Sequence, residues 1–324
     1  MCLASIAVVE VPTGQWPDCV SLLAGQGSGN AALTFRMAAI HTLGLMQDSL
    51  APSDLLPEDV NSIWGAMLHN VSGENLELAK IAAKAIARLA QASAVHFKEE
   101  QQRTAIMNGI FSLLEIQDDD ILYSGLDALI EIAALNYPYM QGYLNQILAV
   151  TERLLSTQEQ NHKNAGYSVE VWTTLFEAEH RNDNDSTAQV KHEVIRKFEW
   201  TKLATLFLNG LQHTGFDEAD QDLEDETDAS LSLACATALA SLAVIVKDEL
   251  LHVSFQFVSQ LVESNTNNQS WTATYVALTA LNGTVVGPSE ETLAQSYAST
   301  LEWVYSQVQS SCQRVRCAAI ILLS

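Results

Sequence analysis

The sequence predicts an all-α protein, an α–α superhelix of about seven helical hairpins, and three observations support this. Apolar residues recur at helical spacing along almost the whole chain of 324 residues. Glycine and proline number only 15 and 6, which suits long helices because proline inside a helix costs about 3 kcal/mol. The third observation is an internal repeat, which also gives the order of the helices.

One helical segment recurs eight times with a small residue at the same place. The steps between these residues are 35, 44, 42, 40, 69, 43 and 42, and most match the roughly 40–47 residue period of HEAT and armadillo repeats. We expect small residues here because helices of adjacent repeats cross closely, at distances set by the side chains at the contact. The eight residues, which we call the small-residue column, are Ala4, Ala39, Ala83, Gly125, Ala165, Ala234, Ala277 and Ala319.

A partner helix with one apolar stripe is expected between successive members of this series. The array lacks a polar capping repeat at either end, which solenoids need for solubility. We therefore expect residues 1–324 to form a single HEAT-type array truncated at both ends. The partner segments are, in order, QWPDCVSLL, EDVNSIWGAMLHNV, QQRTAIMNGIFSLLEI, YMQGYLNQILAVTERLL, WTKLATLFLNGLQ, ELLHVSFQFVSQLV and AQSYASTLEWVYSQV.

The step from Ala165 to Ala234 is about 26 residues longer than its neighbours. Part of the excess, HRNDNDST at 180–187, is polar and predicts a turn-rich segment. The rest is an acidic loop at 214–228, inserted within one repeat. Such a run is usually a solvated loop, but its place inside a regular array favours a binding loop. Its carboxylates are Asp217, Glu218, Asp220, Asp222, Glu224, Asp225, Glu226 and Asp228.

The charge balance narrows the class of partner. The formal net charge is −23, which repels nucleic acid and anionic membranes and attracts basic surfaces. Five cysteines form no paired framework, which favours a reducing intracellular compartment. No apolar run reaches the ~18 residues of a membrane-spanning helix, so no membrane insertion is expected.

No motif predicts catalysis, a cofactor or a metal. The stretch GQGSGN at 25–30 lacks the GK[ST] ending of a phosphate-binding loop. Asp220, Asp222 and Glu224 have calcium-loop spacing, but the glycine and terminal glutamate that such a loop needs are missing. His192-Glu193 has no second histidine four residues on. We therefore expect a binding scaffold and no enzyme. An enzyme would need catalytic side chains that are distant in the sequence and meet only in the folded protein.

One pair of partner helices predicts an apolar groove. Trp64 lies beside Val60 on one partner segment, and the next offers Ala105, Ile106 and Ile110 at a comparable height. Most tryptophans in such an array pack in the core. Two adjacent outer helices could also enclose a shallow pocket for one aromatic side chain of an extended peptide.

Four segments resemble the importin-β (karyopherin-β) nuclear transport receptors. They are CLASIAVVEVPTGQWP, KEEQQRTAIMNGI, LDALIEIAALNYPYMQGYL and WTATYVALTALNGTVVGPSEETL. The similarity runs in order across essentially the whole chain, roughly from the third to the tenth HEAT repeat. It implies a receptor that carries cargo through nuclear pores and occurs in the cytoplasm, the nucleus and the nuclear envelope.

The resemblance also implies partners. In the family, Ran-GTP displaces cargo by binding the early repeats and the acidic loop. Residues Asp217 to Asp228 would then face Ran, or the basic import signal of a cargo or an importin-α-type adaptor. The family's pocket for the phenylalanine-glycine (FG) repeats of nucleoporins falls on Val60, Trp64, Ala105 and Ile106.

Three positions depart from the family. Ala105 replaces a phenylalanine of the FG pocket. Asp228 and Ile321 replace tryptophans that contact the adaptor's basic helix, which argues against adaptor binding through this segment. The alternative function is a different HEAT or armadillo scaffold, such as a phosphatase or assembly-factor subunit, and capture by FG repeats separates the two.

Overall fold

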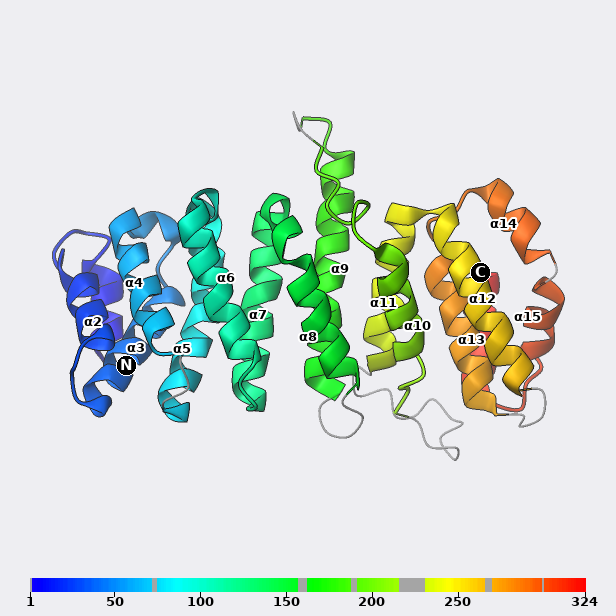
Figure 1. The fold of residues 1–324 in the computed structure, drawn as a ribbon, viewed down its shortest axis with the longest axis horizontal. Helices are drawn as coiled ribbons and strands as arrows, with labels where there is room; N and C mark the ends of the chain where they lie inside the picture. The colour runs from blue at the N-terminus through cyan, green and yellow to red at the C-terminus, as the bar shows by residue number, and fades with distance from the viewer. Residues whose placement is uncertain are drawn as a thin grey trace. The chain divides into compact units, whose positions relative to one another are not determined.

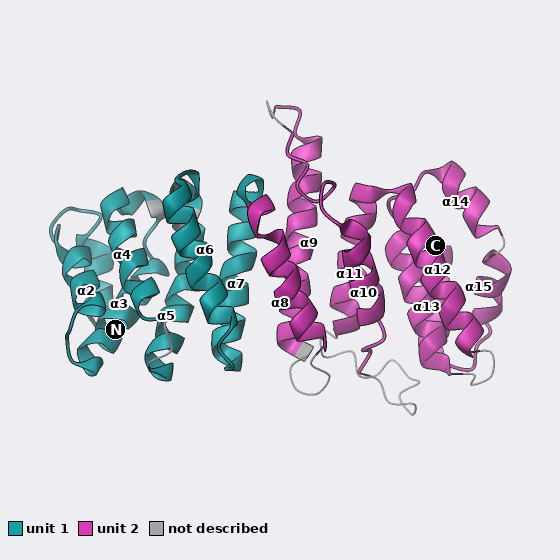
Figure 2. Cartoon of the chain, viewed as in Figure 1, with its two compact units in different colours: residues 1–139 teal, residues 140–324 magenta. Residues whose placement is uncertain are grey.

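A computed structural model describes residues 2–71, 75–156, 162–187, 191–215, 231–265, 270–298 and 300–324. Every regular element in these ranges is a helix (Figure 1). The chain divides into two compact units, Met1–Tyr139 and Met140–Ser324 (Figure 2), which are described separately below. The short 3₁₀ helix η3 (Tyr137–Tyr143) covers the point of division.

The first unit is built from two parallel series of helices. The helices that carry the small-residue column pack side by side, α1 on α3, α3 on α5 and α5 on α7. Their partners do the same, α2 on α4 and α4 on α6, and each partner also packs on the column helix that follows it. The elements are α1 (Cys2–Glu10), α2 (Cys19–Ser28), α3 (Leu33–Gln47), η1 (Pro52–Asp54), α4 (Pro57–His69), α5 (Leu76–Leu89), η2 (Ala90–Lys98), α6 (Glu100–Leu114) and α7 (Asp119–Asn136).

The second unit repeats this pattern. Column helices α9, α11, α13 and α16 pack in succession, and the partners α8, α10 and α12 form the second series. Seven hairpins can be traced in the described residues of the two units, so the predicted helical-hairpin solenoid is confirmed. The elements are α8 (Leu144–Ser156), α9 (His162–Asn184), α10 (Trp200–Gly210), α11 (Leu231–Val246), α12 (Asp248–Asn265), α13 (Trp271–Thr284), α14 (Glu290–Tyr297), α15 (Leu301–Gln307) and α16 (Gln313–Leu323).

Local sequence explains several helix starts. Asn75 caps α5 by accepting a hydrogen bond from the Leu78 N–H at 3.0 Å. Asp118 caps α7 by accepting from the N–H groups of Asp120 and Ile121. Pro57 occupies the first turn of α4, where its missing N–H and fixed φ do no harm. Side-chain oxygens at these starts bind N–H groups that have no partner inside the helix.

The small-residue column is largely buried, and at Gly125 the closest contact is with the partner helix of the same hairpin. Seven of its eight members are buried, and Ala234 is half-buried. A Cβ atom on Gly125 would lie 2.8 Å from Leu114 Cδ2 and 3.4 Å from Leu113 Cβ. Both leucines belong to α6, the partner in the same hairpin. At this position the close approach is therefore within one repeat, and not between helices of adjacent repeats.

The last partner segment is broken into two helices, although the sequence predicted one. Tyr297 ends α14, where its hydroxyl donates to the Leu281 carbonyl at 3.3 Å and its ring meets Phe255 edge-on, with centroids 5.3 Å apart. Val304 of α15 is fully buried in a different cluster.

Candidate functional site

The four residues of the predicted FG pocket lie on two outer helices that pack together in the first unit. Val60 and Trp64 are on α4, and Ala105 and Ile106 are on α6. The exposed fractions of Val60, Trp64 and Ile106 are only 5%, 3% and 2%, whereas Ala105 is exposed. Three of the four side chains are thus buried, and Ala105 is the member of this set that solvent reaches.

Trp64 carries an unusual buried polar group. Its indole nitrogen is buried and finds no hydrogen-bond acceptor among the described residues. A buried N–H without an acceptor costs about 1–3 kcal/mol. The indole of Trp172 in the second unit shows the ordinary situation, because its N–H donates to Thr151 Oγ1 at 3.0 Å.

All eight carboxylates of the predicted acidic loop lie in 216–230, outside the described residues, but the helices on either side are described. Helices α10 and α11 pack together as one hairpin. The Ser232 hydroxyl at the start of α11 donates to the Leu211 carbonyl at 3.0 Å. A Cβ atom on Gly210 would lie 2.5 Å from Cys235 Sγ. The two ends of the acidic segment therefore start from closely packed points of a single hairpin.

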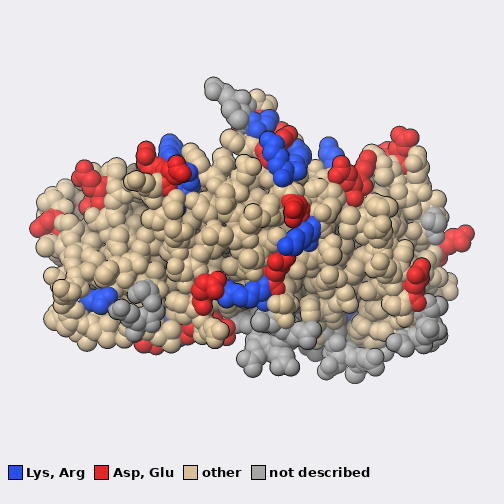
Figure 3. Space-filling model, viewed as in Figure 1, with Lys and Arg blue, Asp and Glu red and all other residues tan. Residues whose placement is uncertain are grey.

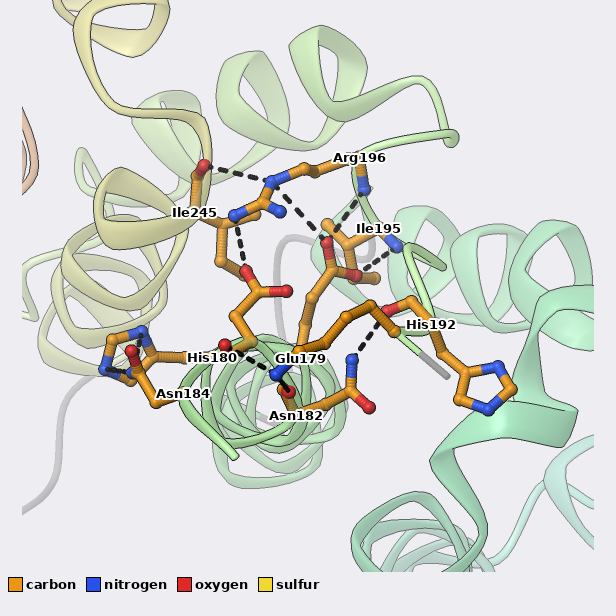
Figure 4. A network of polar contacts seen from close by, with 10 residues as sticks. Glu179, His180, Asn182, Asn184, His192, Ile195, Arg196 and Ile245 are labelled. Atoms are coloured by element: carbon orange, nitrogen blue, oxygen red, sulfur yellow. Dashed lines mark hydrogen bonds and ion pairs between the residues drawn. The ribbon is translucent and has the colours of Figure 1, made fainter. Parts of the chain in front are cut away.

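The sequence predicted a turn-rich segment at 180–187, but the first part of this segment is helical. Helix α9 continues to Asn184, and the segment from His192 to Arg196 lies back against α9 (Figure 4). The Lys191 ammonium donates to the carbonyls of Asn182, Asp183 and Asp185 at 2.6–2.8 Å. These carbonyls have no partner inside the helix, so the lysine caps the extended helix end.

A buried carboxylate holds the returning chain against α9. Glu179 has no exposed surface, and it accepts from the N–H groups of Ile195 at 2.6 Å and Arg196 at 3.3 Å (Figure 4). The Arg196 guanidinium binds Asp183 and also donates to the Ile245 carbonyl at 3.4 Å. Charge-assisted bonds to backbone N–H groups are among the strongest in proteins. No pattern in the sequence predicts this contact, because Glu179 and Ile195 are 16 residues apart.

Two basic residues of α5, Lys80 and Arg88, form ion pairs. Lys80 lies 2.9 Å from Asp118 and 3.3 Å from Asp120, and Arg88 lies 2.9 Å from Asp48. Burial alone would raise the pKa of the Asp118 carboxyl, but hydrogen bonds from Lys80 and from backbone N–H groups lower it below its usual range. Figure 3 shows that most Lys and Arg side chains on the visible face lie beside Asp or Glu.

The described residues hold no group of three or more His, Cys, Asp or Glu side chains placed to bind a metal ion. Among the cysteines, burial raises the pKa of Cys235 to about 12 and also raises that of Cys19, so both remain poorly nucleophilic thiols near neutral pH. Ile321, which the resemblance aligns with a family tryptophan, is exposed on α16, and Asp228 lies outside the described residues. None of the described helices has the length and apolar character needed to cross a membrane.

No family model matches the chain, but individual proteins do. The sequence is 27% identical over 302 residues to importin subunit beta-1 of Schizosaccharomyces pombe, an alignment that covers 89% of this chain and 33% of that protein. The chain thus spans about a third of the length of the curated relatives it matches.

Solved structures agree on the fold. A structure of a Kap95:Nup1 complex matches 98% of this chain and 36% of the other with a TM-score of 0.84 and 20% identity. A second, of Kap95p with RanGDP, matches the same shares with a TM-score of 0.82 and 20% identity. Kap95p is yeast importin-β. Sequence and fold together confirm the resemblance of this chain to the importin-β receptors.

Proposed function

We propose that the chain is the scaffold segment of a nuclear import receptor that binds Ran, basic import signals and FG nucleoporins, without catalysis. The observation that carries this proposal is the similarity to importin subunit beta-1 over nine-tenths of the chain. Support for two of the partner classes comes from the fold, which matches Kap95 in complexes with Nup1 and with RanGDP. The receptor would shuttle between cytoplasm and nucleus.

The acidic segment between α10 and α11 suits the Ran and import-signal part of this function. Eight carboxylates fall within twelve positions that contain no Lys or Arg. Complementary charge speeds encounter with a basic surface and selects against acidic competitors. Two basic partners that share this segment would compete for it, which gives a physical basis for cargo release when Ran-GTP binds.

The seam between α4 and α6 is proposed as an FG-binding position. Ala105 has a smaller side chain than the phenylalanine that the family has at this position, so it leaves more open space on this surface. The Trp64 indole N–H, which lacks an acceptor among the described residues, could be satisfied by a peptide carbonyl if the seam opens slightly. Binding of the peptide here would then supply a hydrogen-bond acceptor to the Trp64 indole and also bury an aromatic side chain.

Capture of the chain by an immobilised FG-repeat peptide tests the FG part of the function. We expect the wild-type chain to be retained and the Ala105→Glu variant to lose at least about tenfold in affinity, since a buried unpaired carboxylate is costly. Ala105 is exposed, so the substitution should leave the fold intact. The matched control is Thr205→Glu at an exposed position of α10, which should bind like wild type. Unchanged binding by Ala105→Glu would place the FG site elsewhere.

Titration with Ran tests the receptor function itself. The chain is mixed with Ran loaded with GDP or with a non-hydrolysable GTP analogue, and binding is followed by calorimetry. We expect tighter binding of the GTP form and displacement of a basic import peptide by it. Equal affinity for the two forms would rule the proposal out.

A further inference from the structure

The first and last column helices of the described structure each have one side that no other column helix covers. An interior column helix packs between two neighbours, as α5 does between α3 and α7, and eight of the 14 residues of α5 are buried. Helix α1 packs on α3 and buries only two of its nine residues. Helix α16 packs on α13 and buries three of its 11 residues. Both helices therefore expose surface that an interior column helix buries.

These two exposed surfaces are apolar. On α1 the exposed fractions of Leu3, Ile6 and Val9 are 41%, 48% and 66%, and their spacing of three residues places them along one side of the helix. On α16 Ile320 and Ile321 are 53% and 56% exposed. Apolar side chains gathered on one exposed surface favour association with another protein, because association removes them from water.

The two surfaces correspond to the two halves of a column contact. Within the chain, such a contact joins one side of a helix to the opposite side of the next, since α5 meets α3 on one side and α7 on the other. The approach is close, because a Cβ atom on Gly44 of α3 would lie 3.0 Å from Ala85 Cβ of α5. On α1 the side toward the following helix is occupied by α3, and on α16 the side toward the preceding helix is occupied by α13. The sides that remain are therefore complementary in the order in which column helices pack.

The charges on these two helices do not oppose a contact between them, although the chain as a whole carries −23. Helix α1 has one charged side chain, Glu10, and α16 has two, Arg314 and Arg316. Because their signs are opposite, these charges attract each other when the two helices approach. Small side chains next to the exposed apolar ones, Ser5 on α1 and Cys317 on α16, leave room for close packing of the helices.

From these observations we propose that the exposed side of α16 in one copy of this chain packs on the exposed side of α1 in a second copy, and so continues the column from one molecule to the next. The contact joins different surfaces of two identical molecules. Contacts of this kind build open filaments unless their geometry closes a ring. This self-association is independent of the receptor function proposed above, since it uses neither the acidic segment nor the seam between α4 and α6.

Analytical ultracentrifugation of the purified chain tests the proposal. We expect the average mass to rise with protein concentration across the micromolar range, and to rise further when added salt screens the net charge. Ile6→Glu and Ile320→Glu each place a carboxylate in the contact and should weaken association about tenfold or more. Both side chains are exposed, so circular dichroism should match wild type, and Leu3→Glu repeats the test if Ile6→Glu fails to fold. A wild-type chain that stays monomeric throughout, or variants that associate like wild type, would overturn the proposal.

Mixing the two variants identifies which surfaces meet. Ile6→Glu keeps the α16 surface intact and Ile320→Glu keeps the α1 surface intact, so an equimolar mixture should form dimers and nothing larger. A two-fold contact between two α1 surfaces would instead let Ile320→Glu dimerise alone, and that result contradicts the proposal, as does a mixture that stays monomeric. Leu233→Glu, at a position 59% exposed on the interior column helix α11, is the matched control and should associate like wild type. Loss of association in this control would place the contact elsewhere.

Discussion

At the scale of single residues, buried polar groups show where the fold is fixed and where it is vulnerable. Glu179 is fully buried but binds two backbone N–H groups and lies 4.0 Å from the Arg196 guanidinium. His96, with an exposed fraction of 4%, has an Nδ1 atom that finds no donor among the described residues. A satisfied buried group stabilises its surroundings, whereas one without a partner costs free energy.

Substitution of Glu179 should loosen the segment that returns along α9. In Glu179→Ala the N–H groups of Ile195 and Arg196 lose their acceptor, which we expect to lower the free energy of unfolding by roughly 2–3 kcal/mol. Glu177→Ala, at an exposed position two residues earlier, should stay within about 0.5 kcal/mol of wild type. Urea denaturation gives the comparison, and equal midpoints for the two variants would contradict the role of Glu179.

His96 should make stability depend on pH. Burial lowers its pKa below the usual ~6.5, and a hydrogen bond to Pro57, whose backbone can only accept, opposes this in part. Because the folded pKa is the lower one, the unfolded chain binds more protons as pH falls through ~6.5, and stability is lost there. The destabilisation caused by His96→Leu should therefore be smaller at pH 5.5 than at pH 7.5. A constant or larger difference in denaturation midpoint at pH 5.5 would count against this.

At the scale of elements, the packing of hairpins depends on positions where a side chain would meet backbone. Gly283 shows this between two column helices, since a Cβ atom there would lie 3.2 Å from the Ala236 carbonyl oxygen of α11. Gly287, just after α13, is tighter still, because a Cβ atom would overlap the carbonyl of Ala243. Backbone atoms cannot rotate away as the end of a flexible side chain can, so the helices would have to separate.

Replacing two glycines by alanine should therefore change the stability of the protein in opposite directions. Gly287→Ala should destabilise the second unit by about 1–3 kcal/mol through overpacking. Gly65→Ala, in the middle of α4 with open space around its Cβ position, should stabilise the protein by about 0.5–1 kcal/mol because alanine favours the helix. Thermal denaturation of the two variants measures both effects. A stabilising Gly287→Ala would show that α11 and α13 can move apart freely.

At the scale of the whole molecule, the net charge of −23 governs encounters with partners more than it governs the fold. Many Lys and Arg side chains in the described residues are already paired with carboxylates, as Lys80 and Arg196 show. The charged side chains in excess are therefore Asp and Glu, and their densest run lies between α10 and α11. Exposed charges act over about 8–10 Å at physiological salt.

Neutralising the acidic run between α10 and α11 should weaken the binding of basic partners without affecting folding. We expect a variant in which the eight carboxylates from Asp217 to Asp228 become amides to lose most of its affinity for a basic import peptide. Its binding should also depend less on salt concentration. The thermal midpoint should stay near that of wild type, since solvated charges contribute little to stability. Amidating Glu290, Glu291 and Glu302 provides a control with fewer charges elsewhere, and equal losses would show that only net charge matters.

The sequence by itself determined the helical hairpins, their order and the family they resemble. Periodicity depends on residues three and four apart, and the small-residue column recurs about every 42 residues, so both are visible in one dimension. It also located the acidic segment within one repeat. The FG-pocket residues could be placed on neighbouring helices by the same reasoning, since Val60 and Ala105 occupy equivalent partner helices.

Only the tertiary structure decided how side chains from distant segments meet. It showed that Trp64 and Ile106 are buried, that Glu179 anchors the chain at Ile195, and that a Cβ atom at Gly125 would meet leucines of its own hairpin. It also brought Trp271 and Trp303 to one cleft. These outcomes depend on packing between residues far apart in sequence, and on burial that makes an unpaired polar group costly. A one-dimensional pattern records neither.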